Sequence, residues 1–269
     1  MIAGCDLDGV IWRGEELIEG SPGAVADLRT AGFEVVFITN NSATTPDAYV
    51  EKLHGFGIDV DADHIVTSAL AGAYVVGQHC AVGARVLSCA GAGVTEALVR
   101  SGFEVVDGGS SEPLGDVDAV VVGWHRVFDF ERLQIAANAV RSGAIFVATN
   151  TDATYPGARG TVLPGNGSLV AAVATAGGRL PLIAGKPHSA MASYVCDRFG
   201  NEGIMIGDRI STDGEFARVL GWPFGLVLSG IAGSDGGEDP AASDAQWIAD
   251  DLQTLVAQVL NSGPGQTAS

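Results

Sequence analysis

The chain begins with Met1-Ile2-Ala3-Gly4-Cys5-Asp6-Leu7-Asp8-Gly9-Val10-Ile11-Trp12, and this stretch decides the fold. An apolar run leads directly into two aspartates one residue apart, a pattern typical of a buried strand that ends with carboxylates facing solvent. The two-residue period of an extended chain places Asp6 and Asp8 on the same side. Two such close charges repel each other, which predicts either a divalent metal ion or a shared proton between them. Alone, Asp-Leu-Asp-Gly is equally typical of a surface turn.

The composition is that of a globular chain with a large acidic excess. Its 269 residues are 47% hydrophobic and 17% charged, which is enough for a buried core and for two domains. With 32 acidic against 14 basic residues, the formal net charge is -18, which argues against nucleic acid or an anionic membrane as a partner. No window approaches the roughly 18 apolar residues of a membrane span, so we expect neither a span nor a signal peptide.

The cysteines indicate the compartment. Cys5, Cys80, Cys89 and Cys196 are scattered along the chain and form no C-x-x-C pair. In a chain of this size, such usage favours a reducing cytoplasm over disulfide bonds and argues against structural zinc. We therefore expect a cytoplasmic protein with free thiols.

Apolar strands alternate with helical segments along the chain. Residues 33–38 are nearly all apolar, as in a sheet covered on both faces, and a helix with Ser21 as its cap and Pro22 in its first turn precedes them. The β-α-β-α order predicts a doubly wound parallel sheet with ligands at the carboxyl ends of its strands. The pattern begins again near Gly83, which predicts an inserted α/β domain with its exit near Pro181.

The predicted division is a discontinuous core over residues 1–80 and 181–269 and an inserted domain over residues 81–180. In the second part of the core we expect a short strand or bend over residues 182–185, strands over residues 203–207 and 224–228, and helices over residues 189–199, 214–220 and 248–260. A polar loop is expected over residues 108–115, and a frayed tail from Ser262.

Polar side chains follow four of the predicted core strands. They are Asp6 with Asp8, Thr39 with Asn40, Lys186, and Asp208 with Asp213. Such strand ends converge on one crevice of a doubly wound sheet. Carboxylates bind magnesium, while hydroxyl, amide and ammonium donors hold a phosphoryl group, so the set is typical of phosphoryl transfer to an aspartate. Taken singly, the residues at 39 and 40 could merely cap the next helix, and the lysine could be a solvated charge.

Together these residues resemble the four ordered motifs of the haloacid dehalogenase (HAD) superfamily. The matching stretches are Asp6-Leu7-Asp8-Gly9-Val10-Ile11, Thr39-Asn40-Asn41, Gly185-Lys186-Pro187, and Gly207-Asp208-Arg209 with Thr212-Asp213. The insertion resembles the class IIA cap of nitrophenyl phosphatase, phosphoglycolate phosphatase and glycerol-3-phosphate phosphatase relatives. The resemblance implies a Rossmann-like HAD core with an inserted α/β cap domain.

The resemblance also implies the chemistry. It implies a magnesium-dependent phosphomonoester hydrolase that acts on small organic phosphates through an aspartyl-phosphate. Asp6 would be the nucleophile, and Asp8 would protonate the leaving oxygen and then activate water. Magnesium would bind the Asp6 carboxylate, the Asp8 backbone carbonyl and the Asp208 carboxylate, with Asp213 orienting its waters. The phosphate oxygens would be held by the Thr39 hydroxyl, the Asn40 backbone and Lys186.

Specificity would lie in the cap, which closes over the leaving group in such enzymes. The candidates are His125, Asp152 and Asn166. The pair His125-Arg126 stands where cap relatives often have an acidic residue, and it either reshapes the pocket or is an ordinary exposed pair. Ser211 stands where relatives usually carry a carboxylate. Relatives often pair through their caps, which leaves a homodimer open.

Three other interpretations are weighed against this one. A receiver-like phospho-accepting module combines similar residues on a parallel sheet, but it is far shorter and carries its acceptor aspartate on a middle strand, where this chain has Thr39. A dehalogenase lacks the second acid, so Asp8 argues against it. A nucleotide monophosphate phosphatase of the same superfamily is the alternative to an enzyme for glycerol phosphate or phosphoglycolate.

Overall fold

A computed structural model describes residues 1–108, 115–156, 161–233 and 237–262 of the chain. Contacts between Cα atoms divide the chain into two compact units. Unit 1 comprises residues 1–39, 47–66 and 186–269, and unit 2 comprises residues 40–46 and 67–185. The loop expected over residues 108–115 and the tail expected from Ser262 lie largely outside the described residues.

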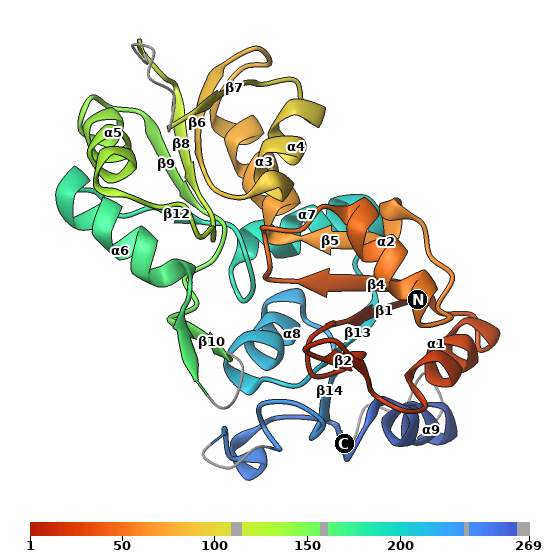
Figure 1. Ribbon diagram of the computed structural model, residues 1–269. Coiled ribbons are helices and arrows are strands. Elements are labelled where there is room, and N and C mark those ends of the chain that lie inside the picture. The colour runs from red at the N-terminus through yellow and green to blue at the C-terminus, as the bar shows by residue number, and fades with distance from the viewer. Residues whose placement is uncertain (109–114, 157–160, 234–236, 263–269) are drawn as a thin grey trace. The chain divides into compact units, whose positions relative to one another are not determined.

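Unit 1 is built on a sheet with the strand order β15-β14-β13-β1-β4-β5 (Figure 1). Its strands are β1 (Ile2–Cys5), β4 (Glu34–Thr39), β5 (Ile65–Thr67), β13 (Gly203–Gly207), β14 (Phe224–Val227) and β15 (Trp247–Ala249). Its helices are α1 (Ser21–Thr30), α2 (Pro46–Gly55), α7 (Ser189–Phe199), α8 (Glu215–Leu220) and α9 (Leu252–Ser262), and β2 (Trp12–Arg13) and β3 (Glu16–Leu17) form a small hairpin. Parallel pairing of β1 with β4 and β13, and of β14 with β13 and β15, confirms the predicted α/β class.

Both faces of this sheet are covered. Cys5, Phe37 and Ile206 point into an apolar cluster that includes residues of α1, α2 and α9. Their strand neighbours Val36 and Met205 are also fully buried, and α7 and α8 pack together beside β13. Burial on both faces explains why these strands are apolar throughout instead of alternating.

Unit 2 contains a second sheet of parallel pairs in the order β12-β9-β8-β6-β7. Its strands are β6 (Arg85–Cys89), β7 (Glu104–Asp107), β8 (Ala119–Val122), β9 (Ile145–Ala148) and β12 (Leu182–Ile183), and β10 (Thr154–Pro156) pairs with β11 (Val162–Pro164). Its helices are α3 (Ser68–His79), α4 (Ala92–Arg100), α5 (Phe130–Arg141) and α6 (Asn166–Gly177). Figure 1 shows α5 and α6 on one side of this sheet and α3 and α4 on the other.

The position of strand β12 differs from the prediction for residues 182–185. We expected these residues in the sheet of the predicted core, but β12 pairs in parallel with β9 of unit 2. The ladder continues to Ala184, whose N–H donates to the Ala148 carbonyl at 2.9 Å, so the chain stays in unit 2 until Gly185. Lys186 therefore follows an edge strand of the second sheet and not a strand of the first.

Two helix starts also differ from prediction. Ser21 is the first residue of α1, and its Oγ donates to the Val10 carbonyl at 3.1 Å instead of capping the helix. The helix expected from residue 248 begins only at Leu252, after β15. Asp251 accepts from the N–H of Thr254 at 2.8 Å, which supplies the capping contact that starts α9 there.

The compact units and the predicted domains differ in the placement of α3. By its contacts this helix belongs to unit 2, where it packs on α4. The predicted core of residues 1–80 and 181–269 includes α3. The assignment of a cap function to residues 81–180 stays a prediction.

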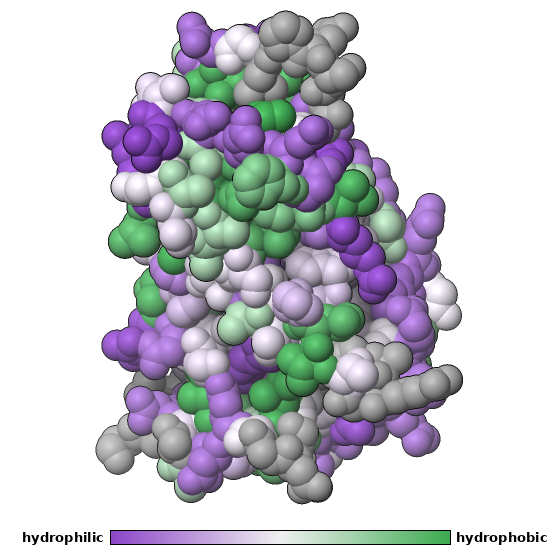
Figure 2. Space-filling model, turned by 60° about the vertical axis from the view of Figure 1, so that its left-hand side comes forward, coloured by the Kyte–Doolittle hydropathy of each residue, from purple (hydrophilic) through white to green (hydrophobic). Residues whose placement is uncertain are grey.

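Polar and apolar side chains share the face of the molecule drawn in Figure 2. In unit 2, the large and well exposed apolar side chains include Val127, Phe130 and Leu180, with exposed fractions of 63%, 76% and 86%. Exposed apolar residues are common singly on globular proteins. In its described parts, the chain has no helix with both the length and the apolar character needed to cross a bilayer.

The four cysteines are free thiols in different surroundings. Burial raises the pKa of Cys5 and of Cys89 to about 12, and it raises the pKa of the half-buried Cys80 and Cys196 as well. We expect a thiol reagent at about pH 8 to label Cys80 and Cys196 in the folded protein, and the two buried thiols only after unfolding, because the accessible thiolate is the reactive form. Counting labelled thiols before and after adding denaturant tests this. Rapid labelling of all four in the native protein would contradict it.

Candidate active site

Asp6 and Asp208 follow the carboxyl ends of two neighbouring strands. Asp6 comes directly after β1 and Asp208 directly after β13, and the two strands pair with Cys5 beside Ile206. Strands β4 and β5, which follow β1 in the chain, lie on one side of β1 in the sheet. The later strands β13, β14 and β15 lie on its other side. The two aspartates therefore lie at the point where the strand order reverses, which is where doubly wound sheets bind ligands.

The first two aspartates differ sharply in exposure. Asp6 is only 7% exposed, whereas Asp8 is exposed and its Oδ1 accepts from Trp12 Nε1 at 2.8 Å. Strand β1 ends at Cys5, and the chain then turns around the Leu7 carbonyl, which accepts backbone N–H groups of the following turn. The strand period from which we expected both carboxylates on one side does not apply here, because β1 ends at Cys5, before either aspartate.

Lys186 joins two buried carboxylates. Its Nζ donates to Asp6 Oδ1 and to Asp213 Oδ1, each at 2.6 Å, and to the Ile38 carbonyl at 2.9 Å. The Lys186 side chain is only 2% exposed, so these contacts are shielded from water. Burial alone would lower the pKa of Lys186, but the charges of Asp213 and Asp6 outweigh that effect and raise the pKa. The ammonium group therefore stays charged.

Asp6, Asp208 and Asp213 form a cluster of buried acids. Each offers a carboxylate oxygen, and these oxygens lie within 4.8 Å of one another. Burial and the neighbouring Asp213 charge raise the pKa of Asp208 to about 6. Burial also raises the pKa of Asp6, against the opposing charge of Lys186. One ammonium group does not balance three carboxylates, so the charge and the oxygen donors fit a divalent cation such as magnesium.

Two glycines leave the space that these carboxylates occupy. A Cβ on Gly207 would lie 2.4 Å from Asp213 Oδ2, and a Cβ on Gly9 would lie 2.4 Å from Asp208 Oδ2. Gly9 also has a φ of 82°, in the left-handed region that side chains disfavour. The glycines of the first and last motifs are thus required by the close approach of the acids.

Glu238 is a residue that the sequence analysis missed. Its carboxylate accepts from the backbone N–H of Ile210 and, at 3.2 Å, from that of Ser211. These N–H groups open the π-helical turn Ile210–Gly214, which carries Asp213. Ser211 is the position where the resemblance led us to expect a carboxylate, and one reaches its backbone from 27 positions further along the chain. No periodic or motif signal marked it.

Thr39 and Asn40 lie on the two sides of a unit boundary. Thr39 is the last residue of β4 and is 2% exposed. Asn40 belongs by its contacts to unit 2. Because Lys186 donates to the Ile38 carbonyl, the end of β4 is tied to the buried lysine within unit 1.

The three specificity candidates of unit 2 have different surroundings. Asp152 is half-buried, and its Oδ2 accepts from Asn40 Nδ2 at 3.3 Å. Asn166 is 2% exposed and donates through Nδ2 to the Asn150 carbonyl at 2.8 Å. His125 is half-buried, with its ring edge-on to Phe128. Their part in specificity stays a prediction.

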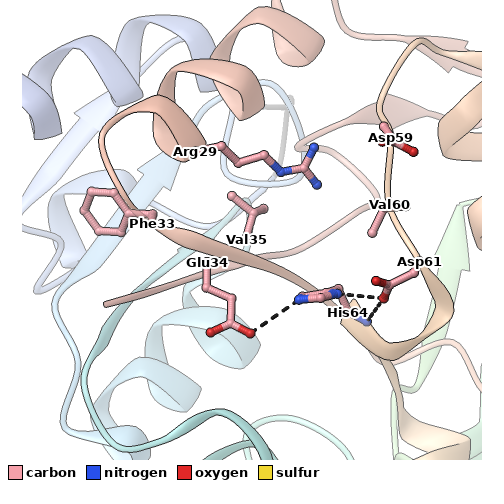
Figure 3. A pocket seen from close by; sticks show the side chains of 8 residues that line it. All are labelled: Arg29, Phe33, Glu34, Val35, Asp59, Val60, Asp61 and His64. Atoms are coloured by element: carbon pink, nitrogen blue, oxygen red, sulfur yellow. Dashed lines mark hydrogen bonds and ion pairs between the residues drawn. The ribbon is translucent and has the colours of Figure 1, made fainter.

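A surface cavity of about 570 Å³ lies in another part of unit 1 (Figure 3). It is lined by Arg29, Phe33, Glu34, Val35, Asp59, Val60, Asp61 and His64. Glu34 is the first residue of β4 and Thr39 is its last. The cavity therefore lies at the amino end of this strand, whereas the motif residues lie at its carboxyl end. Within it, His64 is held between Asp61 at 2.7 Å and Glu34 at 3.3 Å. The clustered carboxylates do not line this cavity.

Comparison with known proteins identifies the family. Residues 3–104 match the model of a family described as haloacid dehalogenase-like hydrolase, and residues 183–255 match that of an HAD-hydrolase-like family. A chloroplastic phosphoglycolate phosphatase of Arabidopsis thaliana is 34% identical over 245 residues, which cover 84% of this chain and 68% of that relative. The chain belongs to the HAD superfamily.

Two further relatives narrow the position of this HAD protein within the superfamily. An acid sugar phosphatase of Staphylococcus epidermidis is 37% identical and is matched over 77% of this chain and 78% of its own length. A glycerol phosphate phosphatase from Mycobacterium tuberculosis, solved in complex with magnesium, has a TM-score of 0.82 and 32% identity, over 94% of this chain and 76% of that one. The expected membership in the class IIA HAD phosphatases, which are phosphoric monoester hydrolases, is confirmed.

Metal binding by this HAD protein should depend on pH through Asp208. Its pKa of about 6 means that a proton competes with the metal below that pH. We expect the affinity for magnesium to level off above about pH 6 and to fall below it by up to about tenfold per pH unit. Calorimetric titration with magnesium from about pH 5 to about pH 8 measures this.

The matched variants separate this effect from the general charge of the acidic chain. Asp208→Asn should lose both the affinity and its pH dependence, whereas Asp27→Asn, at an exposed position of α1, should keep both. A magnesium affinity that stays constant over this pH range would be evidence against Asp208 as a ligand.

Proposed function

We propose that this protein is a magnesium-dependent phosphatase of small organic phosphates that forms an aspartyl-phosphate on Asp6. The observation that carries the proposal is the buried contact of Lys186 with Asp6 and Asp213, beside Asp208. A phosphate dianion does not approach three carboxylates unless cations offset their charge. Lys186 and a divalent ion would together provide that offset.

The proposed magnesium ligands are the carboxylates of Asp6 and Asp208 and the backbone carbonyl of Asp8. Asp213, proposed to orient the waters of the metal, lies in the same cluster of oxygens and is a further candidate for direct binding. When bound, the ion would supply positive charge to the developing phosphoryl oxygens.

Asp6 is the proposed nucleophile. Its Oδ1 accepts from Lys186, which orients the carboxylate and leaves Oδ2 as the candidate attacking atom. Attack forms the bond between Oδ2 and phosphorus as the bond from phosphorus to the leaving oxygen breaks. Hydrolysis then returns the Asp6 carboxylate and releases inorganic phosphate.

Asp8 is the proposed acid and base. It would give a proton to the leaving oxygen in the first step and take one from the attacking water in the second. Its exposed carboxyl group can exchange protons with solvent, and Trp12 Nε1 holds one of its oxygens in place. These properties suit a group that changes its protonation state twice in each turnover.

The phosphate group itself is proposed to contact Thr39, the backbone N–H of Asn40 and Lys186. The named relatives are phosphatases of phosphoglycolate, glycerol phosphate and acid sugars, which supports a small organic phosphate as substrate. A nucleotide monophosphate is the second candidate.

A receiver-like module would differ from a phosphatase of either substrate class in showing no sustained turnover. A screen of phosphate release over metabolites separates these possibilities.

Two properties of the whole molecule are also proposed. A reducing cytoplasm is supported by the four free thiols. Pairing of two copies through the cap is proposed from the resemblance alone, because cap relatives often pair in this way. The elution volume of the purified protein tests the pairing. The net charge of -18 argues against nucleic acid as a partner.

Variants of the two aspartates should fail in different steps. Asp6→Asn should lower turnover of p-nitrophenyl phosphate by about a thousandfold or more, because no nucleophile remains. Asp8→Asn should release p-nitrophenol in a burst and then turn over slowly, because this leaving group needs no acid whereas the hydrolytic water needs a base. With glycerol phosphate, whose alkoxide leaving group needs the acid, the same variant should show no burst. Rapid-quench and steady-state assays measure these rates.

Asp47→Asn, in the first turn of α2, is the control and should leave both steps unchanged. Near-normal turnover by Asp6→Asn, or a wild-type rate that is indifferent to a chelator, would refute the proposed mechanism.

A further inference from the structure

Two of the residues proposed to hold phosphate stand where the chain passes between the units. Thr39 is the last residue of unit 1 before the chain enters unit 2 at Asn40, and Lys186 is the first residue after the chain leaves unit 2 at Gly185. The geometry of Asn40 therefore constrains the carboxyl end of Thr39, and the geometry of Gly185 constrains the amino end of Lys186.

Asn40 and Gly185 approach each other closely inside unit 2. A Cβ on Gly185 would lie 2.6 Å from Asn40 Oδ1 and 2.5 Å from the carbonyl oxygen of Thr149. Gly185 is buried, so a side chain there would have to displace one of these groups. Asn40, where the chain enters unit 2, and Gly185, where it leaves unit 2, are therefore packed so closely that no methyl group fits between them.

The Asn40 carbonyl is held by two donors of unit 2. Ser68 Oγ donates to it at 2.5 Å and Asn150 Nδ2 at 2.7 Å. Ser68 is fully buried and Asn150 is 5% exposed, so water does not compete freely for the carbonyl. Asn40 Nδ2 donates in turn to Asp152. A residue whose carbonyl and side chain are both bonded has little freedom to rotate its backbone.

Asn166 fixes the position of Asn150. Its Nδ2 donates to the Asn150 carbonyl at 2.8 Å and lies 3.3 Å from Thr149 Oγ1. Thr149 Oγ1 donates to Ser42 Oγ at 3.0 Å, so the segment that begins at Asn40 is bonded to residues 149 and 150 at two places. Ser42, Ser68, Thr149, Asn150 and Asn166 are buried, whereas Asn40 is half-buried, so most of the network is shielded from water and specific in geometry.

We propose that Ser68, Asn150 and Asn166 are positioning residues for phosphate binding. They constrain the backbone of Asn40, and through it the Thr39 and Asn40 donors that are proposed to contact phosphate. Gly185, which has no side chain, lets the chain pass close to Asn40 just before Lys186. The inference rests on the proposed function and adds the residues that align it. Loss of a positioning residue should weaken phosphate binding and leave magnesium binding unchanged.

Three single variants and a double variant test this. Ser68→Ala and Asn150→Ala each remove one donor to the Asn40 carbonyl, and Asn166→Ala releases Asn150. We expect each to reduce the affinity for inorganic phosphate, measured by calorimetry with magnesium present, and kcat/KM for p-nitrophenyl phosphate by about tenfold. Because the first two act on one carbonyl, the double variant of Ser68 and Asn150 should lose less than the product of the single losses.

Ser101→Ala is the matched control. Ser101 Oγ donates to the Ala97 carbonyl at 2.8 Å on α4, so this variant also removes one hydroxyl-to-carbonyl bond from unit 2. It should change neither phosphate affinity nor kcat/KM. Melting curves show which variants are folded at the assay temperature. Ser68→Cys, which keeps a weaker donor in the same place, should fall between wild type and Ser68→Ala.

The outcomes separate this proposal from the proposed function. If wild type binds inorganic phosphate without turnover, the proposed function fails, and the positioning role is judged by phosphate affinity alone. Phosphate affinity that is unchanged in folded Ser68→Ala or Ser68→Cys and in folded Asn150→Ala overturns the positioning role. An equal loss in Ser101→Ala would also overturn it, and a wild type that binds no phosphate would overturn both proposals.

Discussion

The buried contact between the Lys186 ammonium group and the carboxylates of Asp6 and Asp213 is the constraint on which the rest of the site depends. It joins residues 180 and 27 positions apart in the chain, and each partner is almost completely withdrawn from water. Removing one partner of a buried ion pair typically costs about 3–5 kcal/mol, because the other charge is left uncompensated. These residues therefore hold one another in place before any ligand binds.

The same contact explains how an acidic chain can accept an anionic substrate. Three buried carboxylates face one ammonium group, so the site carries a negative excess that a divalent cation would offset. The net charge of the whole chain acts over distances at which salt screens it, whereas the groups inside the site act at close range. Local cations, and not the net charge of -18, decide whether a phosphate can enter.

Hydrogen bonds to backbone groups align the remaining parts of the site. In unit 1, backbone N–H groups at residues 210 and 211 are held by Glu238, which orders the turn that carries Asp213. In unit 2, side-chain amides and a serine hydroxyl hold the chain where it departs from Thr39. Both arrangements join segments that are distant in sequence. Closing the chain between such segments costs conformational entropy, which these hydrogen bonds help to offset.

The sequence by itself determined the buried strands, the parallel α/β class, the inserted domain and the four polar motifs, because each is encoded locally in apolar runs, turn residues and adjacent functional groups. It also carried the resemblance to the HAD superfamily that the relatives bear out. Only the tertiary structure decided that Lys186 leaves an edge strand of the second sheet, that Asp8 turns out to solvent while Asp6 is buried, and that Glu238 reaches the last motif. These features depend on contacts between segments far apart along the chain, and no local period or spacing specifies which distant segment will arrive.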